Sequence, residues 1–259
     1  MTIEEEVEAI VNESGNSFHC RVANYLQAQG WHIQVSPYYM DSSTNKPREI
    51  DIIAEKAWPY NNTFEGIYGT INIKLFIECK YIPTTNVFWF GPKDMASSRE
   101  WLERNTPLER ENHFSNMHHY VATNPEIAKL FSSKNRPNTE NEVIYKALNQ
   151  SLNSMVYLRH RESIIPAPND RHPNVLANIE MPVIACNSFD KFYRTNMNDD
   201  AAAQKIEDNF QLEVNYAYVD QAQNNQNEFF LIDVVDFNQI DNFLSLIEAD
   251  KDALFNVIR

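Results

Sequence analysis

Cysteine, glycine and long apolar runs are all scarce in this sequence. Its 259 residues include three widely spaced cysteines with no Cys-x-x-Cys pair. This pattern argues against a disulfide framework or zinc finger and predicts reduced thiols in a cytoplasmic protein. Five glycines provide no glycine-rich phosphate-binding loop. No run approaches the roughly 18 apolar residues of a membrane span, and the acidic start is unlike a secretory signal, so no membrane partner is expected.

Basic residues are also few. The chain has 22 Lys and Arg against 36 Asp and Glu, a formal net charge of −14. Proteins that grip nucleic acid non-specifically neutralise phosphates with Lys and Arg, so the composition argues against tight non-specific DNA binding. A local basic stripe remains compatible with an acidic total. A hydrophobic content of 43% indicates a folded globular protein, and without a linker or repeat we expect a single domain over residues 1–259.

The segment from Ile71 to Lys80 is the most informative part of the chain. Apolar and polar residues alternate along it, which predicts a strand with one apolar face. Glu78 and Lys80 share the other face, roughly 6–7 Å apart along the strand. A carboxylate beside an ammonium suits a site that binds a metal and activates a water. An ordinary salt bridge at a strand end would give the same pattern.

A second strand is predicted upstream, over Arg48–Ala54. Glu49 and Asp51 share one face of it, with apolar residues on the other. If the two strands are neighbours, Asp51 lies close to Glu78 and Lys80. Glu49 would then bind a second metal or remain a solvated acid at the start of the strand, and both readings stay open.

The sequence Ile50-Asp51, followed after 26 residues by Glu78-Cys79-Lys80, resembles the restriction-endonuclease-like superfamily, the PD-(D/E)xK nucleases. The proline that often precedes the aspartate is absent. The resemblance implies hydrolysis of phosphodiester bonds, with DNA expected as the substrate rather than RNA. It implies Mg²⁺ as the cofactor, with Mn²⁺ as a substitute. It implies that Asp51, Glu78 and the Cys79 carbonyl bind the metal. Lys80 would orient or deprotonate the attacking water or stabilise the developing charge.

The expected order of elements fits the same superfamily, whose core is an α/β fold of the order α-β-β-β-α-β with a mixed sheet. Between the first two of these strands, Pro37–Pro47 is predicted to be a polar turn region. Ala57–Thr70 is predicted to be an extended hairpin or a small excursion. The core elements are predicted at Phe18–Gln29, Trp31–Ser36, Arg48–Ala54, Ile71–Lys80, residues 139–160 and Met181–Cys186.

The remaining segments are predicted to be additions to this core. Residues 83–138 are expected to be an inserted helical segment, with short helices at Ser97–Arg104 and Pro125–Ser132. Residues 208–259 are expected to extend the sheet with extra C-terminal strands and a helix, at Gln211–Val219, Phe229–Val235 and Phe237–Ala249. The core elements would therefore occupy residues 14–82 and 139–187.

Two further residues are candidates for the site. Relatives often carry another acid on the first helix, where this chain offers His19 instead, so the number of metals stays open. Relatives also often place a polar residue on the later helix, where Gln150 lies. A surface amide, like its neighbour Asn149, is the favoured interpretation of Gln150.

Histidines and aromatic residues elsewhere are interpreted as structural. His113, His118 and His119 have no Cys or acid at a recognised spacing, so we expect surface or loop histidines. Phe88, Trp89 and Trp101 could stack on bases, but packing is the more common role of such residues.

Two other classes of function are compatible with the sequence. The chain could be a non-catalytic nuclease-fold subunit that binds or assembles within a defence or mobile-element system. An acidic protein that mimics DNA is a weaker alternative. The net charge of −14 favours both, whereas the complete set of Asp51, Glu78 and Lys80 favours the enzyme. A homodimer is compatible with either.

Overall fold

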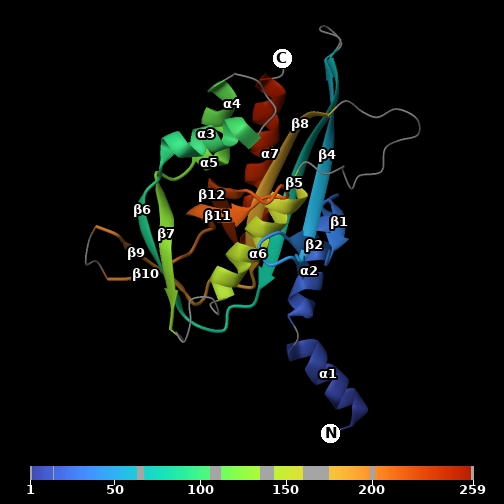
Figure 1. Ribbon diagram of the computed structural model, residues 1–259. Helices are drawn as coiled ribbons and strands as arrows, with labels where there is room; N and C mark the ends of the chain where they lie inside the picture. The colour runs from blue at the N-terminus through green and yellow to red at the C-terminus, as the bar shows by residue number, and fades with distance from the viewer. Residues whose placement is uncertain are drawn as a thin grey trace.

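The computed structural model describes residues 2–13, 15–62, 67–105, 112–134, 143–159, 175–198 and 202–257. Within these ranges the fold is α/β: ten strands form one mixed sheet, and two more form a separate hairpin (Figure 1). The strand order in the large sheet is β1-β4-β5-β8-β12-β11-β7-β6-β9-β10. The late strands β11 and β12 therefore lie in the same sheet as the motif strands.

The helices are α1 (Ile3–Glu13), α2 (Asn16–Ala28), α3 (Met95–Asn105), α4 (Asn112–Met117), α5 (His119–Ala122), α6 (Val143–Leu158) and α7 (Ile240–Val257), with a 3-10 turn at Phe237–Gln239. The strands are β1 (His32–Val35), β2 (Tyr38–Asp41), β3 (Lys46–Glu49), β4 (Ile52–Asn62), β5 (Ile67–Lys80), β6 (Asn86–Pro92), β7 (Glu126–Ser133), β8 (Val175–Cys186), β9 (Phe192–Asn196), β10 (Gln204–Lys205), β11 (Phe210–Val219) and β12 (Asn225–Asp236).

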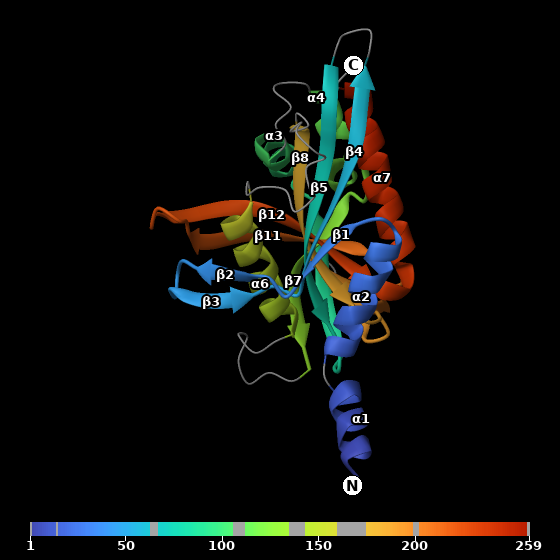
Figure 2. The same ribbon diagram turned by 90° about the vertical axis from the view of Figure 1, so that its right-hand side faces the viewer.

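The part of the sheet that carries the motif consists of β1, β4, β5 and β8. β4 pairs antiparallel with β1 and β5, and β5 pairs parallel with β8. Because a parallel neighbour needs a crossover, the chain returns from β5 to β8 through the segment from β6 to β7 and through α6. Figure 2 shows α2 and α7 on one side of the sheet and α6 on the other.

Amphipathic patterns account for the packing of these elements. α6 buries a stripe at helical spacing that includes Ile144, Leu148 and Leu152. In β5, the adjacent residues Leu75 and Phe76 leave the strand on opposite faces and are both fully buried, as expected for a strand covered on both faces. The core therefore lies on both sides of the sheet, and charged residues of β5 are carried into it.

The segment Pro37–Pro47 is not the polar turn region that was predicted. Most of it forms the β2–β3 hairpin, a sheet of its own. The Asp41 carboxylate stabilises the turn of this hairpin by accepting from Ser43 N–H at 2.9 Å and from the Thr44 hydroxyl at 2.8 Å. Turns built on Asp in this way are favoured because its side chain replaces a backbone acceptor.

The strand predicted over Arg48–Ala54 is therefore wrong as one element. The chain leaves the small hairpin after Glu49 and enters the large sheet at Ile52. Asp51 occupies the break between β3 and β4. The alternation of apolar and polar residues continues across the break. Periodicity alone therefore did not reveal that the chain leaves one sheet and enters another here.

The segment that was predicted to be a helical insertion contains strands as well as helices. A helix is present at α3, but the predicted helix at Pro125–Ser132 is wrong, because β7 occupies this region. The aromatic cluster around Phe88 is strand β6, and Phe88 is fully buried with its ring centroid 4.9 Å from Phe192. Short apolar runs of this kind fit a helix or a strand equally well.

Several other predictions can be located in the described residues. β4 and β5 form a long antiparallel hairpin, the first of the two alternatives for this region. The first four residues of the element predicted over residues 139–160 lie outside the described residues. No helix in the described part of the chain is both long enough and apolar enough to span a membrane.

Candidate active site

The structure brings Asp51, Glu78 and Lys80 together at the end of β5. The Lys80 ammonium lies 2.5 Å from Glu78 Oε2 and 3.7 Å from Asp51 Oδ2. Glu78 and Lys80 share one face of the strand because they are two residues apart. Asp51 reaches them from the break just before β4, which pairs with β5 from Ile52 opposite Ile77.

The backbone on each side holds Asp51 in position. The Cys79 N–H donates to Asp51 Oδ2 at 2.8 Å, and the Asp51 N–H donates to Glu78 Oε1 at 3.4 Å. The Asp51 carbonyl accepts from Ser36 N–H at 2.8 Å and from Nε2 of His19 on α2. His19 therefore contacts the site through the main chain of Asp51.

Burial and neighbouring charges act in opposite directions on Glu78 and Lys80. Glu78 is fully buried, whereas the side chains of Asp51 and Lys80 are 22% and 18% exposed. Burial raises the pKa of Glu78 to about 8, although the Lys80 ammonium opposes this change. Burial also disfavours the Lys80 ammonium, but Glu78 and Asp51 outweigh it and raise the pKa of Lys80.

Gln150 lies beside the site rather than in an isolated surface position. Its Oε1 accepts from the Lys80 ammonium at 3.4 Å, and its Nε2 donates to the Glu49 carbonyl at 3.5 Å. The amide thus bridges β3 and β5 from α6. The sequence favoured a surface amide for Gln150 over a position beside the site. The sequence alone did not show which face of α6 packs against the sheet.

Glu49 does not join this group through its carboxylate. It lies opposite Tyr38 in the β2–β3 hairpin, and a hydrogen bond with the Glu49 carboxylate raises the pKa of Tyr38. Glu49 is the last residue of β3, whereas Asp51 lies in the break before β4. The prediction that the two residues share a face of one continuous strand is wrong.

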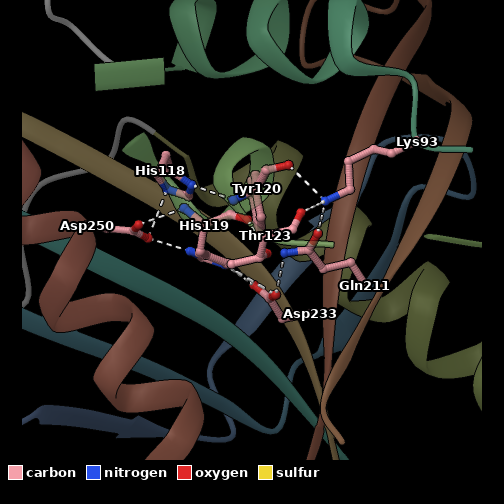
Figure 3. A network of polar contacts seen from close by, with 8 residues as sticks. All are labelled: Lys93, His118, His119, Tyr120, Thr123, Gln211, Asp233 and Asp250. Carbon is pink, nitrogen blue, oxygen red and sulfur yellow. Dashed lines mark hydrogen bonds and ion pairs between the residues drawn. The ribbon is translucent and has the colours of Figure 1, made fainter. Parts of the chain in front are cut away.

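A second charged cluster was missed from the sequence. His118 and His119 were predicted to be surface or loop residues, but both are buried, 0% and 3% exposed. Nδ1 of His119 contacts the Asp250 carboxylate, and Nε2 of His119 lies 3.2 Å from an oxygen of Asp233 (Figure 3). His118 Nε2 lies 3.2 Å from Asp250 Oδ2.

The acids of this cluster come from distant parts of the chain. Asp233 is on β12 and Asp250 is on α7, so no local spacing connects them to the histidines. One atom each from His118, His119 and Asp250 lies within 4.8 Å of the others, as in a metal site. His113 is part of α4, and its side chain lies outside the described residues.

Comparisons of the chain with family models, with curated proteins and with solved structures gave no match.

Proposed function

We propose that this protein is a metal-dependent nuclease that hydrolyses phosphodiester bonds, with DNA as the preferred substrate and Mg²⁺ as the metal. The observation that carries the proposal is the convergence of Asp51, Glu78 and Lys80 at the end of β5. Two carboxylates and an ammonium in contact are the groups needed to bind a divalent ion and act on a water beside it.

The donor atoms fit a magnesium ion. Mg²⁺ takes hard oxygen ligands and retains several waters, and Asp51 and Glu78 offer carboxylate oxygens. In the present structure the Lys80 ammonium lies next to an oxygen of each carboxylate, so a cation already occupies the attractive position between them. When Glu78 loses its proton, the two carboxylates outnumber this ammonium, and the resulting excess of negative charge would attract a second cation.

The Cys79 carbonyl is a suitable third ligand. In an extended strand, the N–H and C=O of one residue point towards the same neighbour. Since the Cys79 N–H donates to Asp51, its carbonyl is expected on the Asp51 side of the strand. The Lys80 carbonyl accepts from Asn187 N–H on the opposite side, which agrees with this alternation.

The arrangement of elements around the site supports the same proposal. α2, β1, β4, β5, α6 and β8 follow each other as a helix, three antiparallel strands, a helix and a strand parallel to β5. This is the order expected of a restriction-endonuclease-like core. The β2–β3 hairpin and the segment from β6 to β7 are then additions to that core.

Each residue can be given a role in hydrolysis. A bound Mg²⁺ would polarise the phosphate and lower the pKa of its water. Asp51 and Glu78 would hold the ion, and the Lys80 ammonium would orient the attacking water or stabilise negative charge on the phosphate. Gln150 would restrain Lys80, and His19 would position Asp51 through its carbonyl.

A cleavage assay with matched variants tests the proposal. Wild-type protein is incubated with single-stranded DNA, duplex DNA and RNA in Mg²⁺ or Mn²⁺, beside Glu78→Gln and the control Glu49→Gln. We expect cleavage by wild type and Glu49→Gln and its loss in Glu78→Gln. If the wild-type protein cuts none of these substrates, the proposed nuclease activity is refuted.

The net charge of −14 favours a second candidate, a nuclease-fold subunit that binds or assembles without cutting. Titration with Mn²⁺ separates the two candidates. Specific binding that Glu78→Gln abolishes supports the enzyme, and the absence of binding together with the absence of cleavage supports the silent subunit.

A further inference from the structure

His119 lies between two carboxylates that come from different elements. Its Nδ1 contacts Asp250 on α7, and its Nε2 lies 3.2 and 3.3 Å from the two oxygens of Asp233 on β12. The His119 N–H also donates to Asp250 Oδ1 at 2.8 Å. All three side chains are at most 6% exposed, so water contributes little to their charges.

The tautomer of His118 distinguishes a metal site from a network held by protons. His118 Nδ1 accepts from Tyr120 N–H at 3.1 Å, so this nitrogen carries no proton. A neutral His118 then carries its proton on Nε2, which lies 3.2 Å from Asp250 Oδ2. A histidine that binds a metal through Nε2 needs a lone pair there and normally donates through its other nitrogen. The hydrogen bond from Tyr120 is incompatible with that arrangement.

His119 requires the opposite protonation. An ionised carboxylate can only accept hydrogen bonds, and each ring nitrogen of His119 faces one. Both nitrogens therefore have to carry a proton, which makes the ring a cation. Neither nitrogen is left with a lone pair for a metal.

We propose that His119 is a buried imidazolium that locks the insertion onto the C-terminal part of the fold, and that this lock opens when the proton is lost. His119 begins α5, inside the segment between β6 and β7, whereas its partners lie on β12 and α7. The lock thus joins His119 to two elements near the C-terminal end that lie 114 and 131 residues away in sequence. This inference is independent of the nuclease proposal.

Other charged groups around the lock complete its charge balance. Lys93, at the end of β6, donates to the Tyr120 carbonyl at 3.0 Å and to Gln211 Oε1 at 2.7 Å. Gln211, on β11, in turn lies 3.5 Å from Asp233 through its Nε2. Two carboxylates thus face the cations His119 and Lys93 (Figure 3).

The remaining titratable neighbours do not change this balance. Burial lowers the pKa of His118 to about 4, and burial with Asp233 raises the pKa of Tyr120, so both are neutral near pH 7. Glu213 on β11 faces Lys93 and pairs with Lys129 at 2.9 Å.

The direction of the pH dependence follows from His119. Burial alone would lower its pKa, but Asp250 and Asp233 outweigh burial and raise the pKa to about 10, from an ordinary value of 6.5. The folded protein therefore holds a proton that the unfolded chain has released. The stability from this proton is complete below pH 6.5 and is lost as the pH rises towards 10.

The first experiment observes the protons directly in the wild-type protein. Nitrogen-15 NMR of labelled histidine side chains at pH 7.5 distinguishes protonated from bare ring nitrogens. We expect two protonated nitrogens in His119 and a protonated Nε2 alone in His118, with no change after treatment with a chelator. A bare nitrogen in His119, or stoichiometric zinc bound to the protein, would overturn the proposal.

The second experiment measures the coupling to stability. Urea unfolding is followed between pH 7 and 8 for wild type, His119→Gln and the control His32→Gln, which alters an exposed histidine. Groups common to the three proteins, such as Glu78 and Lys93, largely cancel in the differences. The unfolding constant of wild type should rise about tenfold per pH unit relative to His119→Gln, as expected for one proton.

The control His32→Gln should follow wild type. Parallel pH profiles of wild type and His119→Gln would contradict the lock. If His119→Gln does not fold, the NMR measurement on wild type decides the question by itself.

Discussion

The two charged clusters lie on opposite faces of one sheet and differ in how their charges are balanced. Asp233 pairs with Val183, which pairs with Ile77 on its other side. Asp233 is therefore level with Ile77 and shares its face. Glu78 is the next residue along β5, so its side chain leaves on the opposite face.

The balance of charge explains why the clusters suit different tasks. Around His119, two carboxylates meet two cations, and every ring nitrogen faces a defined partner. Around Lys80, two carboxylates share one ammonium, and burial raises the pKa of Glu78 to about 8. The first cluster is complete as it stands, whereas the second acquires an excess of negative charge when Glu78 loses its proton, and a divalent ion would neutralise that excess.

The largest expected effect on stability distinguishes the two clusters. Asp250→Asn should lower the free energy of unfolding by about 3–5 kcal/mol, because it leaves the His119 cation buried with half of its compensation. Asp51→Asn should change this free energy by about 1 kcal/mol or less, because Asp51 is partly exposed and repels Glu78. Urea unfolding of both variants gives the comparison, and equal losses would remove the distinction between the clusters.

The second effect concerns catalysis. Glu78→Gln should reduce Mg²⁺-dependent cleavage by at least about 10²–10³-fold, the range seen when one group that stabilises a transition state is removed. The variant should remain as stable as wild type, because an amide of the same shape avoids burying a carboxylate. Cleavage rates and urea unfolding are measured together. A variant that loses cleavage and is also much less stable than wild type would show that Glu78 has a structural role instead.

Metal addition and removal should affect one cluster only. Mg²⁺ or Mn²⁺ at about 100 times its dissociation constant should stabilise the wild-type protein by about 2.7 kcal/mol. We expect no stabilisation of Glu78→Gln and full stabilisation of His118→Gln, relative to each variant without metal. Thermal unfolding with added metal and with a chelator measures this. Stabilisation that is lost in His118→Gln would place the metal at the His118–His119 cluster, and this would contradict the proposed site at Glu78.

The smallest expected effect concerns the support of Lys80. Gln150→Ala should reduce cleavage by about tenfold or less, the value of about one hydrogen bond, because its contacts with Lys80 and Glu49 are long at 3.4 and 3.5 Å. The adjacent Asn149→Ala is the matched control and should cleave like wild type, since the Asn149 amide donates within its own helix to Tyr145 O. Equal effects of the two variants would mean that the position of the amide is unimportant.

Local patterns correctly predicted strand β5 and the shared face of Glu78 and Lys80. The alternation along Ile71–Lys80 was sufficient to place Glu78 and Lys80 on one face, because strand geometry depends on nearest neighbours. The same argument failed for Glu49 and Asp51. Their alternation was intact, but the chain leaves β3 after Glu49 and enters β4 only at Ile52, with Asp51 in the break. This break depends on the pairing of β3 with β2 and of β4 with β1.

The sequence by itself determined the elements with strong periodicity, such as α6, β5 and β11, and the acidic composition. It did not determine β7, because its short apolar run is compatible with either a helix or a strand. Nor did it determine the surroundings of His118 and His119, because their partners Asp233 and Asp250 are 114 and 131 residues from His119. Only the tertiary structure decided that pairing, since burial and opposite charge act between elements that meet after the sheet has formed.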